Sequence, residues 1–399
     1  MSDSPPQLPT ALIHHPYKPP AGFEAVSPAI HRASTVIFPN VAALRTRDWK
    51  HKTGYTYGLH GTPTTFLLEE RIATLEGGKF CTLVPSGLAA VVLVGMALLK
   101  TGDELLIPDN AYGPNKAFAH GELAAWGITH QFYDAMNPAD LAAKLSAKTR
   151  LVWLEAPGSV TLEFPDLPVL VAVVKAHADA HPSGIVTALD NTWGAGIAFN
   201  AFALGADISA QALTKYPSGG ADVLMGSVVT QSEALHHLIH FCHMRVGYGV
   251  AGNDAELVLR GLNSIALRYA AQDSTTRAVA SWMQAQSQVA TVLHPALPGS
   301  PGHETFKRDC TAAACLFSAV FKPEFSQAQV DRFCDSLKLF KLGYSWAGPM
   351  SLCAPYDMPS LRTTRWPHKG GLVRFSVGLE AAEDLQKDLA QALSVMHYS

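Results

Sequence analysis

The sequence predicts an α/β fold, with a mainly parallel sheet in a large domain of residues 61–260 and a smaller α/β C-terminal domain of residues 261–399. Short apolar runs typical of buried strands alternate with helical segments, and this alternation favours parallel strands joined by right-handed crossovers. Several runs end at a polar or glycine-containing turn, as the strands of a parallel sheet do beside a ligand crevice. The predicted strands lie at residues 80–84, 104–108, 151–155 and 185–190, with a further strand-like run from residue 208 towards residue 215.

The composition is that of a compact globular enzyme or oligomer, with 48% hydrophobic and 16% charged residues among 399. The net charge is −3 and no basic block occurs, which argues against nucleic acid or an anionic membrane as a partner. The longest apolar run, residues 88–99, is too short to span a bilayer. Six cysteines without a CxxC motif, and an N-terminus without signal-peptide features, predict reduced thiols and a cytoplasmic location.

Residues 1–60 are rich in proline, histidine and threonine and predict an extended arm with one short helix near residues 41–47. Such a segment rarely stabilises itself, so we expect it to dock on a neighbouring subunit. From residue 66 the apolar residues follow helical spacing, which predicts a helix that ends at Gly77-Gly78.

The predicted strand at residues 80–84 leads through Pro85-Ser86-Gly87-Leu88 into a long apolar helix. A helix that begins at such a turn offers free backbone amides and the positive end of its dipole, and both favour phosphate. The segment has no GxxxxGK[ST] motif, so it is not a Walker A loop. The alternative is a tight strand–helix connection that binds nothing.

Asp190 and Lys215 follow two successive strand-like runs. A carboxylate beside a pyridine nitrogen keeps that nitrogen protonated, and a lysine amine can hold an aldehyde as a Schiff base. Together they are the smallest set of side chains with which a protein can bind and activate pyridoxal phosphate (PLP). Taken alone, the pair could equally be a solvated loop acid and a surface lysine.

The motifs Leu189-Asp190-Asn191-Thr192-Trp193 and Ala212-Leu213-Thr214-Lys215-Tyr216 resemble the Cys/Met-metabolism family of PLP-dependent enzymes. The resemblance runs from about residue 55 to residue 380. It implies the aminotransferase-like fold (fold type I), with Asp190 paired to the pyridine nitrogen and Lys215 carrying the cofactor. It also implies that Tyr112 stacks on the ring and helps to deprotonate the substrate amine, and that Ser86, Gly87, Leu88 and Thr214 bind the cofactor.

Tyr55-Thr56-Tyr57-Gly58-Leu59-His60 resembles the Tyr-x-Arg motif with which family members bind the PLP phosphate of the neighbouring subunit. Tyr57 matches the motif, but Leu59 stands where the arginine is expected, and an apolar side chain cannot bind phosphate. His60 or the loop backbone is the candidate replacement. The resemblance therefore implies a homotetramer built from dimers that share active sites.

Two further motifs compete with this interpretation. Residues 247–252 match GxGxxG, but they follow a histidine-rich helical stretch instead of a strand, so we do not expect a dinucleotide site. His236, His240 and His243 share one helix face, with Cys242 beside them. Three ligands on one helix are rare in structural zinc sites, so we expect a solvated or interface face and no metal.

An arginine and an aromatic segment near the C-terminus indicate the substrate. Arg374 lies between apolar neighbours in a predicted strand, and an inward arginine requires a carboxylate partner. That partner is either a structural acid or, as the family implies, the α-carboxylate of a small amino-acid substrate, held by Arg374 and Ser345. Tyr344-Ser345-Trp346 and Pro157-Gly158-Ser159 resemble the β-lyase branch of the family, with Tyr344 and Trp346 as an aromatic wall.

The resemblance to that branch implies β-elimination of L-cystathionine to homocysteine, pyruvate and ammonia, as in methionine biosynthesis. The alternatives are γ-lyase, γ-synthase or O-acetylhomoserine sulfhydrylase chemistry in the same fold. An alternative of another class, a dinucleotide-binding or non-catalytic protein, requires that Lys215 carries no cofactor.

Overall fold

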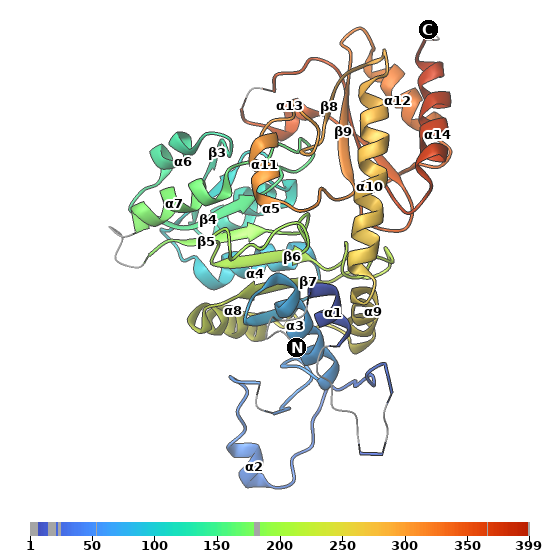
Figure 1. Ribbon diagram of the computed structural model, residues 1–399. Coiled ribbons are helices and arrows are strands. Elements are labelled where there is room, and N and C mark those ends of the chain that lie inside the picture. The colour runs from blue at the N-terminus through green and yellow to red at the C-terminus, as the bar shows by residue number, and fades with distance from the viewer. Residues whose placement is uncertain are drawn as a thin grey trace.

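The structure is a computed structural model that describes residues 7–14, 21–22, 25–52, 54–178, 184–364 and 366–397 (Figure 1). Parts of the predicted arm, residues 1–6, 15–20, 23–24 and 53, lie outside the described residues. The strands form a seven-stranded and a five-stranded sheet. Among the described residues, no helix combines the length and the apolar character needed to cross a bilayer.

The seven-stranded sheet has the order β1-β7-β6-β5-β4-β2-β3. The pairs from β6 to β3 are parallel, whereas β7 is antiparallel to both β1 and β6. Because β7 runs back from the edge at which β6 ends, the connection between them stays at that edge, and it carries Lys215. The strands are β1 (Phe80–Val84), β2 (Glu104–Pro108), β3 (Thr129–Tyr133), β4 (Thr149–Glu155), β5 (Val186–Asp190), β6 (Ile208–Ala212) and β7 (Gly226–Thr230).

Both faces of this sheet are buried, which explains the apolar runs in β2 and β4. Along β4, Val152 and Leu154 belong to the core beneath α3 and α7, while Leu151 and Trp153 belong to the core beneath α4 and α8. The helices of this part of the chain are α1 (Leu8–Ile13), α2 (Val41–Arg45), α3 (Pro63–Glu76), α4 (Gly87–Leu98), α5 (Gly113–Phe118), α6 (Pro138–Lys144), α7 (Leu167–Ala178), α8 (Glu233–Val246) and α9 (Gly252–Leu262), with a π-helical turn at Ala119–Leu123.

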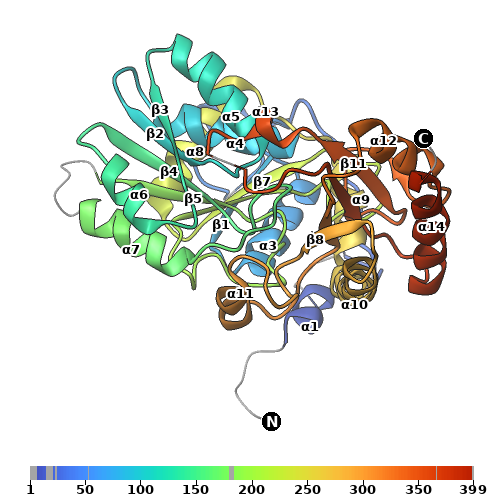
Figure 2. The same ribbon diagram turned by 90° about the horizontal axis from the view of Figure 1, so that it is seen from above.

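The five-stranded sheet has the order β10-β11-β12-β9-β8, and only β10 and β11 pair in parallel. Figures 1 and 2 show α12 and α14 on the side of this sheet that faces away from the seven-stranded sheet. Its strands are β8 (Val289–Leu293), β9 (Leu316–Phe321), β10 (Lys341–Leu342), β11 (Leu352–Tyr356) and β12 (Leu372–Ser376). The helices are α10 (Ile265–Gln284), α11 (His303–Asp309), α12 (Gln327–Ser336), α13 (Met358–Leu361) and α14 (Ala382–Ser394), followed by a 3-10 turn at Val395–His397.

The histidine row on α8 corrects one sequence-based interpretation. His236, His240 and His243 are buried and stack on one another, with ring centroids 5.5 and 6.1 Å apart, and Phe80 of β1 stacks on His236. Burial lowers the pKa of His236 to about 3 and the pKa of His240 and His243 to about 4. The expectation of a solvated or interface face was therefore wrong, because neutral imidazoles pack here as aromatic rings inside the chain.

The GxGxxG match at residues 247–252 connects two helices. Gly247 ends α8 in the left-handed conformation, with φ 73°, and Gly252 begins α9. A dinucleotide fingerprint requires a strand before the turn. The segment lacks that strand, as expected from the sequence.

Candidate active site

A cavity of about 480 Å³ lies where the carboxyl ends of β4, β5 and β6 meet the five-stranded sheet and the segments that flank its strands. It brings together residues that are widely separated along the chain. Ser345 is hydrogen-bonded to one of them, Lys215. The predicted site residues that line the cavity are Ser86, Gly87, Leu88, Tyr112, Asp190, Thr214, Lys215, Tyr344, Trp346 and Arg374.

Asp190 is fixed at the end of β5 by Thr192. The backbone N–H and the hydroxyl of Thr192 both donate to Asp190 Oδ1, at 3.0 and 2.6 Å. The hydroxyl of Thr192 also accepts a hydrogen bond from the backbone N–H of Ala212 at 3.0 Å, which ties this carboxylate to the end of β6. Burial raises the pKa of Asp190, against the opposing effect of the Thr192 hydrogen bonds. A buried carboxylate in this position gains by pairing with a cation such as a protonated ring nitrogen.

Lys215 presents its amine to the cavity. Its Nζ donates to Ser345 Oγ at 2.9 Å and lies 5.3 Å from the centre of the Trp346 ring. Burial, followed by the positive charge of Arg374, lowers the pKa of Lys215 from 10.5 to about 8. At pH 7 roughly a tenth of these amines are neutral, against about one in three thousand for an ordinary lysine. Lys215 is therefore suited to act as a nucleophile and as a base.

We expect the apoenzyme to capture PLP at a rate that rises with pH up to about 8 and then levels off, because only the neutral amine of Lys215 attacks an aldehyde. Stopped-flow absorbance after mixing apoenzyme with PLP measures this rate. The reaction of PLP with N-acetyl-lysine, recorded in parallel, corrects for ionisation of PLP itself. A rate that kept rising to about pH 10 would show that Lys215 has the pKa of an ordinary lysine.

The N-terminus of α4 lies at the cavity and fits an anion. Ser86 is the N-cap, and its Oγ accepts from the backbone N–H of Ala89 at 3.0 Å. The backbone N–H groups of Gly87 and Leu88 lie in the first turn of α4, where a helix offers no carbonyl to accept from them, so they can donate to a ligand. A Cβ on Gly87 would lie 2.5 Å from the Cβ of Ala212, so glycine is required for the helix to approach β6 this closely. This geometry can hold a phosphate monoester.

Thr214 lines the cavity beside Lys215, but its hydroxyl is already engaged. Oγ1 donates to the carbonyl of Met225 at 3.2 Å and accepts from the backbone N–H of Met225 at 3.1 Å. These bonds fix the connection between β6 and β7. One lone pair of the hydroxyl is left for a ligand.

Arg374 lies on the cavity side of β12, whereas its neighbours Val373 and Phe375 face the core beneath α10, α12 and α14. The side chain is buried, donates from one guanidinium nitrogen to the carbonyl of Tyr344 at 2.8 Å, and lies 5.2 Å from the Tyr356 ring. Among the described residues, no carboxylate forms an ion pair with it. A buried arginine without an acidic partner, beside a cavity, is suited to bind a carboxylate ligand.

Tyr112 is positioned by a residue to which the sequence assigned no role. Its backbone N–H donates to Glu155 Oε2 at 2.8 Å, and Glu155 lies opposite Asp190 in the register of β4 and β5. Burial, followed by the charge of Asp190, raises the pKa of Glu155 well above its usual range. Burial likewise raises the pKa of Tyr112. The sequence did contain one indication of this role, because Glu155 is a carboxylate at the carboxyl end of a predicted strand.

The aromatic wall of the cavity includes a tyrosine that the sequence analysis did not identify. Trp346 packs edge-on against Tyr216, with ring centroids 5.8 Å apart, and lies close to Lys215. Tyr344 is 77% exposed, so it stands at the mouth and not in the interior. Tyr356 of β11 lines the cavity between Tyr344 and Arg374. No sequence motif marked Tyr356, because only the pairing of β11 with β12 brings it there.

Tyr57 lies apart from the residues that line the cavity of this chain. It forms an isolated β-bridge with Thr35, and its side chain is 45% exposed. The neighbouring His60 shares a hydrogen bond of 2.6 Å between its Nδ1 and the hydroxyl of Thr56. Burial lowers the pKa of His60, so at neutral pH it does not supply the positive charge that an arginine would.

A lysine amine, a buried carboxylate and a helix-terminal anion site around one cavity define an enzyme that works with a phosphorylated aldehyde cofactor. Comparison with known proteins identifies the family. A sequence model described as "Cys/Met metabolism PLP-dependent enzyme" matches residues 9–394. The chain therefore belongs to this family, is an enzyme and uses PLP, as the resemblance implied.

The relatives of this chain are named for different activities within the family. The chain is 38% identical over 377 residues to a putative cystathionine β-lyase of Rhizobium johnstonii, a match that covers 92% of this chain and 91% of that protein. It is 36% identical over 370 residues to the cystathionine β-lyase of Escherichia coli, with 92% of each covered. The solved cystathionine γ-synthase of Xanthomonas oryzae pv. oryzae, in complex with aminoacrylate and cysteine, matches with a TM-score of 0.88, 28% identity and coverage of 98% and 99%. These similarities confirm the predicted PLP-dependent α/β fold.

Proposed function

We propose that this protein is a cytoplasmic cystathionine β-lyase of methionine biosynthesis. The reaction cleaves L-cystathionine, with one water, into homocysteine, pyruvate and ammonia. The observation that carries the proposal is the convergence of Lys215, Asp190 and the unpaired Arg374 on one cavity with an aromatic wall. The cystathionine β-lyases among the relatives support it.

We assign PLP to the residues whose chemistry fits its parts. Lys215 would bind the aldehyde carbon, and Asp190 the pyridine nitrogen. The amides of Gly87 and Leu88, with the hydroxyls of Ser86 and Thr214, would hold the phosphate, and Tyr57 of a neighbouring subunit would add a further contact. Tyr112 would stack on the ring, since an aromatic side chain at the carboxyl end of a strand can pack flat on a planar heterocycle.

The protein residues position the substrate and move its protons. Arg374 binds the α-carboxylate bidentately, which fixes the orientation of the Cα–H bond. Lys215 Nζ takes the proton from Cα, and the Ser345 hydroxyl holds the amine in place for that step. Burial raises the pKa of Tyr112, so its phenol stays protonated near neutral pH, and its oxygen would accept a hydrogen bond from the substrate amine and so help to position it. When bound, PLP supplies the electron sink for the charge left at Cα.

The aromatic wall favours β-elimination over γ-chemistry. After the Cα proton has left, β-elimination requires only departure of the sulfur on Cβ. γ-Elimination requires a second proton to be taken from Cβ, so the base and the substrate chain must be repositioned. The rings of Trp346 and Tyr356 line the cavity and would present bulky apolar surface to the leaving arm of the substrate. Holding the leaving group in place can contribute several kcal/mol to the rate of the single-step departure.

We predict that the purified enzyme converts L-cystathionine to pyruvate and homocysteine, with little 2-oxobutanoate and cysteine. Mass spectrometry of the keto acids and the thiols measures the partition directly. The cystathionine γ-synthase among the solved structures motivates a second assay, with cysteine and an activated homoserine. If 2-oxobutanoate is the main keto acid, or if γ-replacement is faster, the β-lyase proposal fails and the PLP assignment stands.

We also propose the division of the chain into an arm of residues 1–60, a PLP-binding domain of residues 61–260 and a C-terminal domain of residues 261–399. The grouping of β1–β7 and β8–β12 into separate sheets supports it. In Figure 1, α2 and its flanking segments project from the body, and Val26 and Ile37 are 103% and 91% exposed. Apolar residues so exposed fit contact with a neighbouring subunit in a homotetramer. Light scattering on the holoenzyme would measure this oligomeric state.

A further inference from the structure

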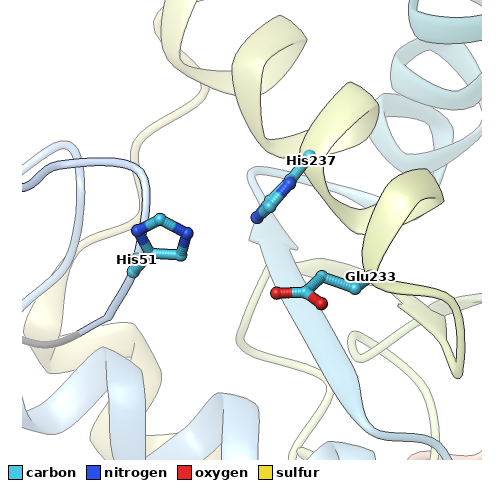
Figure 3. Close-up of side chains that lie close together, drawn as sticks. All are labelled: His51, Glu233 and His237. Atoms are coloured by element: carbon cyan, nitrogen blue, oxygen red, sulfur yellow. The ribbon is translucent and has the colours of Figure 1, made fainter.

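We propose that His51, Glu233 and His237 form a site for a divalent transition-metal ion of the zinc type. Figure 3 shows the three side chains pointing toward one another, His51 from the arm and the other two from α8. Each offers one ligand atom, and these atoms all lie within 4.8 Å of one another. This cluster lies on the outer side of α8, in contrast to the buried row of His236, His240 and His243.

Two of the ligands are presented by one helix. Glu233 and His237 are four residues apart on α8 and therefore lie one above the other on the same face. Glu233 is in the first turn of α8, and its side chain is four positions before that of His237 in the helix. The His237 ring packs on Phe241, with centroids 6.0 Å apart, which restricts its orientation.

The third ligand comes from a segment held in place on both sides of His51. Trp49 packs edge-on against Phe241 of α8, with ring centroids 5.5 Å apart. Lys52 forms an ion pair with Glu69 of α3 and donates to the carbonyl of Cys81 at 2.8 Å. These contacts bring His51 to α8 without a metal, so binding requires little ordering of the chain.

Asp48 prepares His51 for metal binding. The Oδ1 of Asp48 accepts from the backbone N–H groups of Lys50 and His51 at 2.9 and 3.2 Å, while Oδ2 lies 2.8 Å from His51 Nδ1. A carboxylate on Nδ1 fixes the orientation of the ring and leaves Nε2 as the nitrogen free to ligate. Metal-binding histidines almost always have a partner of this kind.

The donor set indicates the class of metal. Two imidazoles and one carboxylate suit zinc and its borderline neighbours, whereas calcium and magnesium prefer oxygen ligands alone. Tetrahedral zinc, with bonds of about 2.0–2.1 Å, places its ligand atoms roughly 3.3 Å apart. His51 and Glu233 are exposed, so small side-chain rotations can close the remaining gap, and the fourth position is left to water. The ion would fasten the arm to α8.

The test uses untagged holoenzyme that has been treated with a chelator and then titrated with Zn²⁺ by calorimetry and with Co²⁺ by visible absorption. We expect one ion per chain and Co²⁺ bands typical of low coordination. His51→Ala and His237→Ala should each abolish both signals. Asp48→Asn keeps Oδ1 but replaces Oδ2 by an amide that cannot accept from Nδ1, so affinity should fall roughly 10–100-fold.

His120 and His130 provide the matched control, because their rings are 5.8 Å apart on another part of the surface. His120→Ala should leave the zinc and cobalt titrations unchanged. Zinc binding that survives His237→Ala, or that falls equally in His120→Ala, would overturn the proposal. Absence of saturable binding in the unmutated holoenzyme would also overturn it. Each variant is checked for its PLP content and thermal midpoint, so that loss of the fold is not mistaken for loss of a ligand.

Discussion

Replacing Lys215 by alanine is expected to lower the turnover number by about 10³-fold or more, with little change in the thermal midpoint of the cofactor-free protein. The variant loses the amine that attaches the cofactor and the base that moves the Cα proton, and a general base alone typically contributes about 10²–10⁴-fold. Stability should be nearly unaffected because the buried amine makes one side-chain hydrogen bond, to Ser345. Steady-state pyruvate formation and differential scanning calorimetry measure the two quantities.

Lys215→Arg is the control that separates charge from chemistry. It retains a cation near Asp190 and Trp346, but a guanidinium can neither attach to an aldehyde nor act as a base near neutral pH. Borohydride reduction followed by peptide mapping should place the pyridoxyl label on Lys215 in the parent enzyme and on no residue of either variant. If either variant stays within about tenfold of the parent activity, another group performs the proton transfer.

The large sheet and the phosphate-binding turn were predictable from sequence because their signals are local. β1 is apolar apart from Thr82, and β4 contains the apolar run of residues 151–154, since the sheet is covered on both faces. The cap at Ser86 follows from a small polar residue placed directly before an apolar helical segment. β3, by contrast, is an edge strand of mostly partly exposed residues, and its sequence Thr129–Tyr133 has no clear apolar alternation.

The parts of the site that sequence did not reveal depend on contacts distant along the chain. Lys215 and Ser345 are 130 residues apart, and their hydrogen bond exists only because the connection after β6 meets the segment before β11. Tyr356 reaches the cavity through strand pairing in the second sheet. The histidine row on α8 was misjudged because helical spacing identifies a shared face but not the side of the helix that packs inward.

Replacing Arg374 by methionine is expected to lower kcat/KM by about 100-fold or more while leaving the fold intact. Removing one partner of a buried charge pair typically costs about 2–5 kcal/mol, and about 2.7 kcal/mol corresponds to 100-fold. In the enzyme–substrate complex Arg374 would be paired with the α-carboxylate. In the free enzyme Arg374 has no acidic partner among the described residues. Methionine, an unbranched side chain, therefore removes a buried charge whose desolvation costs stability. The thermal midpoint should therefore stay level or rise.

The assignment to the α-carboxylate is tested by changing enzyme and substrate together. A cysteine S-conjugate and its α-carboxamide are compared on the parent enzyme and on Arg374→Met. The parent should prefer the acid by about 100-fold, and the variant should hardly distinguish the two, because the charge that discriminates between them is gone. If Arg374→Met kept the full preference for the acid, another cation would bind the carboxylate, and Arg374 would act by holding the carbonyl of Tyr344 at the mouth of the cavity. Arg374→Lys separates these roles further, since a lysine supplies the charge without the bidentate geometry and should restore only part of the preference.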